Sequence, residues 1–421
     1  MGKINQLDLF SGIGGFHLGF EKAGYKVNSY FSEINKHAVA VYKHQFKDST
    51  YVGSVNDVRG GELPRIDLIT FGSPCQDFSL AGKRKGMEGE RSSLILEAIR
   101  LIHECRPRVF IWENVKGTFS SNDGADFAAI LQEFANIGGY RLEWQLLNTS
   151  WFLPQNRERI YLVGHLAEAR GDWGGVFPIT TGTGKDISIQ GHHPRANTLT
   201  ARYTGNANGS FIGECKQPTQ EVKVGTWRTH KDGQGFREVK GGDCPTIPAR
   251  AREDGSGQPV IKVKSATSKG YEVAKEGDSI NLSQPNSETR RGRVGKSKAQ
   301  TLETSCNQAV VTPKIIGYSR DDKGKVTNRH LKDTAGTIHT ASGQGGNTDQ
   351  FVQDYSIRRL TPIECERLQG FPDNHTQYGI YDGELKKMSN TQRYKQCGNA
   401  VTVDVVQAIA ERLHPMFNNL Y

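Results

Sequence analysis

Segments with strand character alternate with segments of helix character through the first 166 residues, and this alternation constrains the fold most. Short apolar runs predict strands, and the longer stretches between them predict helices over residues 13–23, 36–44, 93–104 and 125–137. The predicted strands are residues 7–10, 27–31, 66–71, 109–112, 142–147 and 159–163. Alternation of this kind predicts an α/β fold, a mostly parallel sheet covered by helices on both faces.

The composition changes after His165. Residues 167–354 are rich in Gly, Thr, Ser, Asn and Lys, and their apolar runs are short, which predicts a second, mostly β domain of short strands and long loops. From Tyr355 the earlier character returns: Thr361 is a helix cap with proline at the first helical position, and residues 400–413 predict a final amphipathic helix. We therefore expect one domain built from residues 1–166 and 355–421, with residues 167–354 inserted.

The inserted region contains a loose internal repeat. Each copy pairs Thr with Leu or Ile, and a stretch containing Gly or Asn follows most copies. Such a pattern indicates either duplicated structural units or convergent strand–turn segments in a Thr/Gly-rich domain, and the sequence leaves both open. The copies are Asn197-Thr-Leu-Thr-Ala, Pro245-Thr-Ile-Pro-Ala, Gln300-Thr-Leu-Glu-Thr and Gly336-Thr-Ile-His-Thr.

A glycine-rich turn follows the first predicted strand, in the run Asp8-Leu-Phe-Ser-Gly-Ile-Gly-Gly-Phe. Between a strand and a helix, such a turn lets backbone amides approach a ligand at the carboxyl edge of the sheet. With Gly12 and Gly14 in place, the last glycine of a GxGxxG pattern would fall at His17, which argues against a nicotinamide-binding dehydrogenase. Glu33 follows the next strand about 20 residues later, where an acid can accept hydrogen bonds from ribose hydroxyls.

Chemically capable side chains follow the third and fourth predicted strands. Cys75 lies in Phe71-Gly-Ser-Pro-Cys-Gln, at the edge where ligands bind in such sheets, and this position favours a nucleophile over a buried structural thiol. The polar residues 79–92 include three glycines and predict a mobile lid. Glu113 ends the fourth strand, and an apolar neighbourhood there would raise its pKa and let it donate a proton; otherwise it is a solvated strand end.

Two arginines precede or begin the sixth predicted strand, in Gln155-Asn-Arg-Glu-Arg. Alternation along an extended chain places Arg157 and Arg159 on one face. The alternative is a surface cluster of charge.

Charge and cysteine content narrow the class further. The net charge of +9 favours a polyanionic partner. Seven irregularly spaced cysteines without a CxxC pair argue against disulfides and against a metal site, and for a reducing compartment. No apolar run approaches the roughly 20 residues of a membrane-spanning helix, and Met1 to Gln6 lack the layout of a signal peptide.

Six motifs, taken together and in order, resemble those of the DNA (cytosine-5)-methyltransferase family, of prokaryotic or phage type. The resemblance covers residues 4–166 and 355–415 and implies a Rossmann-like S-adenosylmethionine-dependent methyltransferase sheet with an inserted target-recognition domain. The motifs are Asp8-Leu-Phe-Ser-Gly-Ile-Gly-Gly-Phe, Ser73-Pro-Cys-Gln, Glu113-Asn-Val, Gln155-Asn-Arg-Glu-Arg, Arg359-Leu-Thr-Pro-Ile-Glu-Cys-Glu-Arg-Leu-Gln-Gly-Phe-Pro and Gln396-Cys-Gly-Asn-Ala-Val.

The resemblance implies roles for individual residues. Cys75 would add covalently to carbon-6 of a flipped-out cytosine, and Glu113 would hydrogen-bond ring nitrogen 3 and the exocyclic amine. Arg159 would hold the base carbonyl, and Arg157 would brace the lid or a phosphate. The cofactor S-adenosyl-L-methionine would be bound by Asp8, Phe10, Gly12, Ile13, Gly14, Glu33, Ser54, Asp57 and Asn399.

One departure from the family leaves the adenine contact open. Many members have Gly-Asp-Ile after the second helix, where the Asp holds the adenine amino group. This chain has Gly53-Ser-Val-Asn-Asp, so adenine would be held by Ser54, by backbone, or by Asp57 after a loop shift.

We expect a cytoplasmic monomer that acts on double-stranded DNA, and we expect the inserted domain to read the DNA sequence. No membrane partner is expected, and the sequence is compatible with a cognate restriction endonuclease in the same cell. One alternative is a cytosine-5 methyltransferase acting on tRNA, which the long middle region and the Ser-Pro-Cys-Gln form disfavour. The other is a catalytically silent DNA-binding relative, which would be free to lose Cys75 or Glu113.

Overall fold

A computed structural model provides the structure of the chain, and the ranges that it describes cover most of the two ends and parts of the middle. The described residues are 3–73, 93–166, 175–180, 223–228, 235–238, 259–284, 287–305, 307–320, 326–332 and 351–417.

A seven-stranded sheet organises the first part of the described chain, in the order β3-β2-β1-β4-β5-β8-β6. Strands β1 to β5 pair in parallel, whereas β8 lies antiparallel to both β5 and β6. The α/β prediction is confirmed, and all six predicted strands occur in it, with a short extra strand, β3. The bounds are β1 Lys3–Leu9, β2 Lys26–Ser32, β3 Thr50–Tyr51, β4 Leu68–Gly72, β5 Val109–Val115, β6 Tyr140–Asn148 and β8 Glu158–Leu166.

Helices cover both faces of this sheet, because successive strand residues point to opposite sides. On β5, Val109 and Ile111 pack into the core shared with α1, α7 and α8, whereas Phe110 and Trp112 pack into the core shared with α3 and α4. Helix α2 begins where the Asn35 side chain accepts from two backbone amides. The bounds are α1 Gly15–Lys22, α2 Lys36–Gln45, α3 Ser93–Cys105 and α4 Ala125–Asn136, with short 3₁₀ turns at Gly60–Glu62, Lys116–Phe119, Ser121–Gly124 and Thr149–Trp151.

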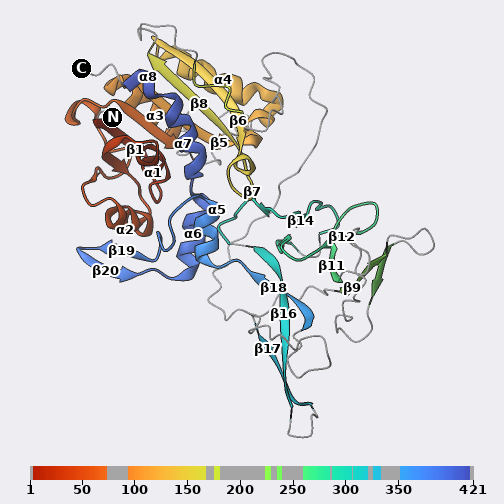
Figure 1. The fold of residues 1–421 in the computed structure, drawn as a ribbon. Helices are drawn as coiled ribbons and strands as arrows, with labels where there is room; N and C mark the ends of the chain where they lie inside the picture. Colours follow the sequence, from red (N-terminus) through yellow and green to blue (C-terminus); the bar gives the residue numbers. More distant parts are fainter. Residues whose placement is uncertain are drawn as a thin grey trace.

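The C-terminal segment packs on the N-terminal part of the chain, as Figure 1 shows for α7 and α8. The Tyr25 hydroxyl donates to the Ala410 carbonyl (3.0 Å), and a Cβ at Gly19 would lie 2.5 Å from Val406. The predicted start of α5 is confirmed as a capping box between Thr361 and Glu364. The bounds are α5 Pro362–Leu368, β19 Tyr378–Tyr381, β20 Glu384–Lys387, α6 Asn390–Asn399, α7 Val403–Arg412 and α8 His414–Phe417.

Among the described residues of the middle region there is no helix, and most strands pair with one another antiparallel; β15 instead pairs in parallel with β7, which precedes β8 in the first domain. Most are short, but β16 and β18 are longer than the sequence predicts, and they pair with each other through Arg359. The bounds are β7 Gln155–Asn156, β9 Lys223–Arg228, β10 Gly235–Glu238, β11 Pro259–Lys264, β12 Tyr271–Ala274, β13 Ser279–Asn281, β14 Val294–Gly295, β15 Ala299–Gln300, β16 Gln308–Arg320, β17 Val326–Lys332 and β18 Phe351–Arg359.

Packing and pairing refine the expected domain boundaries. Val176 and Ile179 belong to the core of the first domain, and Glu143 accepts from the backbone of Val176 and Phe177. The expected boundary at residue 354 falls inside β18, which stays in the middle-region sheet to Arg359. We therefore place the inserted domain, as a proposal, between residues 181 and 359.

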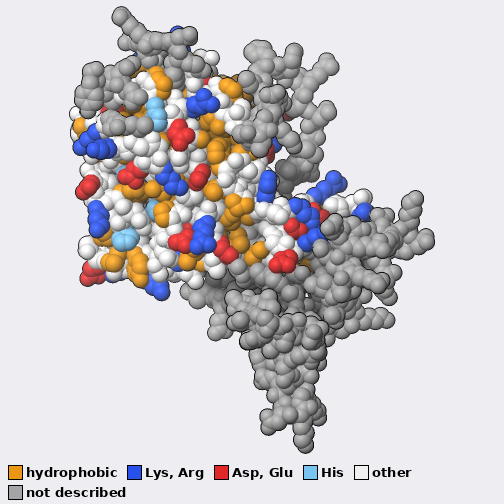
Figure 2. All heavy atoms as spheres, in the orientation of Figure 1, with side chains coloured by type: hydrophobic (Ala, Val, Ile, Leu, Met, Phe, Trp, Pro, Cys, Tyr) orange, Lys and Arg blue, Asp and Glu red, His pale blue; other side chains and the backbone are white. Residues whose placement is uncertain are grey.

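The face of the first domain in Figure 2 mixes lysines and arginines with acidic side chains. The excess positive charge of the sequence is therefore not gathered into one continuous surface on that face. Among the described residues, no helix is both long and apolar enough to cross a membrane.

Candidate active site

The predicted ligand turn follows β1 directly and has a strained, open backbone. Phe10, Gly12 and Gly14 all have positive φ (51°, 54° and 84°), which glycine adopts most readily. A Cβ at Gly14 would collide with the Phe46 ring, whereas a Cβ at Gly12 would meet nothing within 4 Å. Gly12 therefore borders open space at the carboxyl edge of the sheet, where a ligand can approach the backbone.

Glu33 lies against this turn from the end of β2. Its Oε2 accepts from the Gly12 amide (3.0 Å), and its Oε1 accepts from the amides of Ile34 (2.9 Å) and Asn35 (2.8 Å). The carboxylate is thus fixed against the turn by backbone amides; its role toward ribose stays a prediction. Ile34, which the sequence analysis missed, is 80% exposed next to it; the signal was an apolar residue in the polar run Ser32-Glu-Ile-Asn-Lys.

Three of the expected cofactor residues have side chains that lie beneath the turn or point into the core. The Asp8 side chain is fully buried, and the cofactor contact expected of Asp8 stays a prediction. Ile13 is 1% exposed and packs on Phe371 and Val403, although its backbone stays in the turn. Phe10 is half-buried and packs against the core on the α3 and α4 side.

The buried Asp8 carboxyl belongs to a polar network below the turn. Thr70 Oγ1 donates to Asp8 Oδ1 (2.7 Å), and the Tyr42 hydroxyl lies 3.4 Å from Oδ2. The Tyr42 hydroxyl also contacts Ser29 Oγ (2.7 Å) and His17 Nδ1 (3.1 Å). Burial disfavours the charged form and raises the pKa of Asp8 to about 8. This network ties β1, β2, β4 and α2 together under the turn.

Residues from the C-terminal segment reach the same turn. His375, another residue missed from sequence, lies 2.9 Å through Nε2 from the Ile13 carbonyl, and burial lowers its pKa to about 4. A Cβ at Gly15 would lie 2.6 Å from Val401, so the residues after α6 sit against the turn. Asn399, at the end of α6, is exposed close to Val401 in sequence.

Ser54 and Asp57 lie in one turn after β3. The Ser54 carbonyl accepts from the Asp57 amide (2.9 Å), and Ser54 Oγ lies 3.4 Å from the Asn56 amide. Ser54 is half-buried and Asp57 is exposed, so both stay candidates for the adenine contact.

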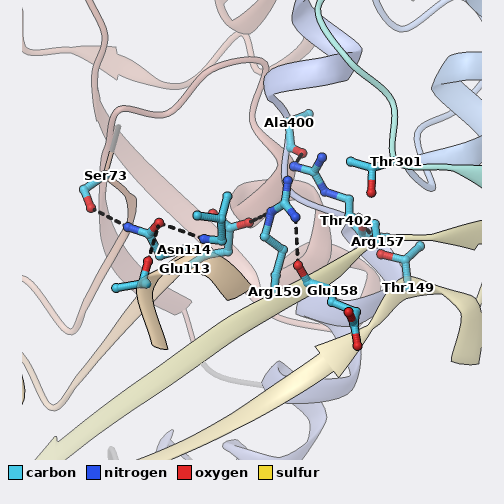
Figure 3. A network of polar contacts seen from close by, with 12 residues as sticks. Ser73, Glu113, Asn114, Thr149, Arg157, Glu158, Arg159, Thr301, Ala400 and Thr402 are labelled. Carbon is cyan, nitrogen blue, oxygen red and sulfur yellow. Dashed lines mark hydrogen bonds and ion pairs between the residues drawn. The ribbon is translucent and has the colours of Figure 1, made fainter. Parts of the chain in front are cut away.

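A second constellation gathers at the carboxyl ends of β4 and β5 (Figure 3). Glu113, 8% exposed, lies 3.1 Å through Oε1 from Arg159 Nε on the antiparallel β8. This contact is an ion pair that lacks hydrogen-bond geometry, and Oε1 has no hydrogen-bond donor among the described residues. Strand β5 continues two residues past Glu113, so the carboxylate is held within the strand and faces Arg159 on β8.

The last described residue before Cys75 is Ser73, and it is firmly held. Trp112 Nε1 (3.0 Å) and Asn114 Nδ2 (3.1 Å) both donate to Ser73 Oγ, which is 4% exposed. The start of the cysteine-containing segment is thereby fixed to β5 on either side of Glu113. Cys75 itself and the expected lid, residues 79–92, lie outside the described residues.

Arg157 and Arg159 have different partners. Arg157, 4% exposed, donates from Nη2 to the Ala400 carbonyl (2.9 Å) and from Nη1 to the Gly398 carbonyl (3.4 Å). Arg159 donates to the Glu158 carbonyl and faces Glu113. Among the described residues, Arg157 therefore holds the loop after α6; its expected contact with a lid or a phosphate stays a prediction.

Comparison with known proteins agrees with this fold. The profile of the C-5 cytosine-specific DNA methylase family matches residues 4–414. The type II methyltransferase M1.ScrFI of Lactococcus lactis subsp. cremoris is 42% identical over 418 residues, which cover 98% of this chain and 78% of that protein. The orphan methyltransferase M.SPRI of Bacillus phage SPR is 28% identical over 461 residues, which cover 99% of each chain.

A solved structure shares the fold. It is described as a DNA modification methyltransferase encoded within a prophage (E. coli), and it aligns with 99% of this chain and 100% of its own, with a TM-score of 0.50 and 18% identity. The sheet with its antiparallel β8 has a Rossmann-like methyltransferase fold, and the matching family is one of DNA methylases. The chain belongs to the C-5 cytosine-specific DNA methylase family and is an enzyme that methylates carbon-5 of cytosine.

Proposed function

We propose that Cys75 is the nucleophile of this methyltransferase and that Glu113 and Arg159 hold the target cytosine. The observation that carries the proposal is the anchored Ser73, which starts the Cys75 segment at the strand end where Glu113 and Arg159 meet. A carboxylate suits the exocyclic amine of cytosine as an acceptor, and an arginine suits its carbonyl oxygen as a donor.

The chemistry requires an activated base, because carbon-5 of cytosine is a poor nucleophile. Addition of the Cys75 thiolate to carbon-6 forms a carbon–sulfur bond and moves electron density to carbon-5. Glu113 hydrogen-bonds ring nitrogen 3 and the exocyclic amine and stabilises this adduct. Once carbon-5 is methylated, loss of its proton and cleavage of the carbon–sulfur bond restore the ring and the Cys75 thiolate. The target lies inside a duplex, so the nucleotide must be flipped out, at a cost of a few kcal/mol.

The residues at the ligand turn fit S-adenosylmethionine. When bound, this cofactor supplies an electrophilic methyl group. Gly12 leaves room for a ligand beside the turn, Glu33 presents a carboxylate for ribose hydroxyls, and the exposed Ile34 offers an apolar surface for adenine. The backbone of Gly12, Ile13 and Gly14 borders the methionine end, with Asn399 at its rim; Asp8 and His375 hold the turn from below.

The expected partner is duplex DNA, with the inserted domain as reader of sequence. Phosphates would be contacted by lysines and arginines, which makes binding depend on salt. We also propose a cytoplasmic monomer; a cognate restriction endonuclease in the same cell stays open.

Bisulfite sequencing tests this function directly. DNA from cells that express the protein should carry 5-methylcytosine within one or a few short motifs, and DNA from cells with the empty vector should not. Unmethylated DNA in cells that contain the folded protein would contradict the proposal. Methylation of tRNA alone would favour the other substrate class.

A further inference from the structure

Residues 299–304 of the middle region lie directly against the catalytic domain. Strand β15 pairs in parallel with β7, which ends one residue before Arg157, with Ala299 opposite Gln155 and Gln300 opposite Asn156. The Ala299 amide also donates to the Pro154 carbonyl (2.8 Å). Strand β15 of the middle region therefore lies beside the strand that leads into Arg157 and Arg159.

The side chains of Thr301 and Leu302 both contact the catalytic domain. Thr301 Oγ1 donates to the Asn156 carbonyl (2.8 Å), one residue before Arg157. The Leu302 side chain is 3% exposed and packs with Leu360 and Cys397. Because both side chains are used in the contact, neither is presented to DNA bases. In the one described copy of the repeat, Thr-Leu therefore docks the domain and does not read sequence.

The same segment touches the last turn of α6 through its backbone. A Cβ at Gly398 would lie 2.7 Å from the Glu303 carbonyl carbon and 2.8 Å from the Thr304 amide nitrogen, so only glycine fits. The Gly398 carbonyl in turn accepts from Arg157. In the middle region, the Glu303 carboxylate accepts from Ser283 (2.9 Å) and Arg290 (3.3 Å). A continuous path of contacts therefore runs from the middle region to Arg157.

We propose that residues 299–304 are a docking segment through which the DNA-reading domain sets the position of Arg157 and Arg159. Thr301 and Gly398 are positioning residues for the reaction: Thr301 fixes the peptide before Arg157, and Gly398 allows the close approach that places the carbonyl bound by Arg157. Arg159 then meets Glu113 correctly only while the reader is docked. This inference rests on the proposed role of Arg159 in holding the base.

A conservative pair of variants tests the hydrogen bond. Thr301→Val keeps the shape and removes the donor, and Thr301→Ser keeps the donor. With unmethylated plasmid DNA and labelled S-adenosylmethionine, Thr301→Val should lower kcat about threefold to tenfold, in line with the loss of one hydrogen bond. KM for DNA and the Kd of the cofactor should stay within about twofold, since phosphate and cofactor contacts are untouched. Thr301→Ser should restore kcat.

A steric pair tests the close approach. Gly398→Ala should lower kcat at least as strongly as Thr301→Val, because the added methyl group pushes residues 303 and 304 away. Gly61→Ala is the matched control, since a Cβ there meets nothing within 4 Å, and its kcat should equal that of the wild type.

The outcomes separate this inference from the proposed function. If the wild-type enzyme methylates DNA and both Thr301→Val and Gly398→Ala keep its kcat, the docking role is wrong while the function stands. The docking role is also wrong if the variants lower Tm but leave kcat unchanged at temperatures well below Tm. A wild-type enzyme that methylates no DNA contradicts the function itself.

Discussion

The two halves of the carboxyl edge of the sheet are built in different ways. The cofactor half, at the ends of β1 and β2, takes its ligand-facing residues from one short stretch of sequence: the turn at Gly12 and Gly14 and the acid Glu33, which bonds the turn directly. Distant residues such as His375 only support this turn. The base half, at the ends of β4, β5 and β8, joins Ser73, Glu113 and Arg159 from three separate strands. Its arginine strand is in turn held by residues 299–304.

This difference indicates that the two halves respond differently to substitutions elsewhere in the chain. The cofactor half is rigid by local backbone geometry and by the buried network under it, so it should tolerate changes elsewhere in the chain. The base half depends on distant segments, which lets the state of the reader influence the chemistry. Substitutions in the base half should therefore abolish turnover while cofactor binding survives.

The largest effect is expected for Cys75→Ser. A hydroxyl is a far weaker nucleophile than a thiolate at neutral pH, so methyl transfer should become undetectable. DNA and cofactor should still bind, which gel shift and calorimetry can measure. Near wild-type turnover by this variant would show that no covalent step occurs at Cys75.

Glu113→Gln should have the next largest effect. The amide cannot act as an acid or carry charge, and contributions of this type are typically ~100- to 10,000-fold in kcat. Glu158→Gln is the control, because Glu158 is a neighbouring acid that pairs with Lys116 near the surface. A loss below about tenfold for Glu113→Gln, or an equal loss in the control, would demote Glu113 to a structural role.

Exchange of the inserted domain should change the DNA sequence that is methylated more than it changes the rate of methylation. Transplanting residues 181–359 into a relative of known specificity should carry the target preference along. An active chimera that keeps the preference of its recipient would remove this domain as the reader. The Thr-Leu/Ile copies other than Thr301-Leu302 also raise the hypothesis of more than one target, which a single motif in bisulfite data would rule out.

The smallest effect concerns the cofactor half and depends on pH. Because burial raises the pKa of Asp8 to about 8, its contribution to stability is full below about 3.8 and is lost as pH rises through about 8. Tm of the wild type should thus fall between pH 6 and pH 9 more steeply than Tm of Asp8→Asn, which cannot titrate. Asp57→Asn, at an exposed site, should follow the wild type. Parallel curves for Asp8→Asn and the wild type would exclude Asp8 as the titrating group.

Sequence patterns predicted the parts that local rules determine. Six strands of the first domain, the cap at Thr361 and the acid beside the glycine turn follow from short-range signals, whereas the two-residue β3 was not predicted. The burial of Asp8 could not be predicted, because its partners Thr70 and Tyr42 lie on other elements. The same holds for Arg157: alternation predicted its face, but only the fold brings the carbonyls of Gly398 and Ala400 to it. Roles for Cys75 and Glu113 came from the family resemblance, since a lone cysteine or acid has many uses.

Covalent trapping tests the central claim most directly. A duplex that carries the motif found by bisulfite sequencing, with 5-fluorocytosine at the target, should form a stable adduct in the presence of S-adenosylmethionine, because fluorine blocks the final proton loss. Peptide mapping by mass spectrometry should find the methylated base on Cys75. An adduct on Cys105 or Cys397 would contradict the account, as would the absence of any adduct from enzyme that methylates the unmodified duplex.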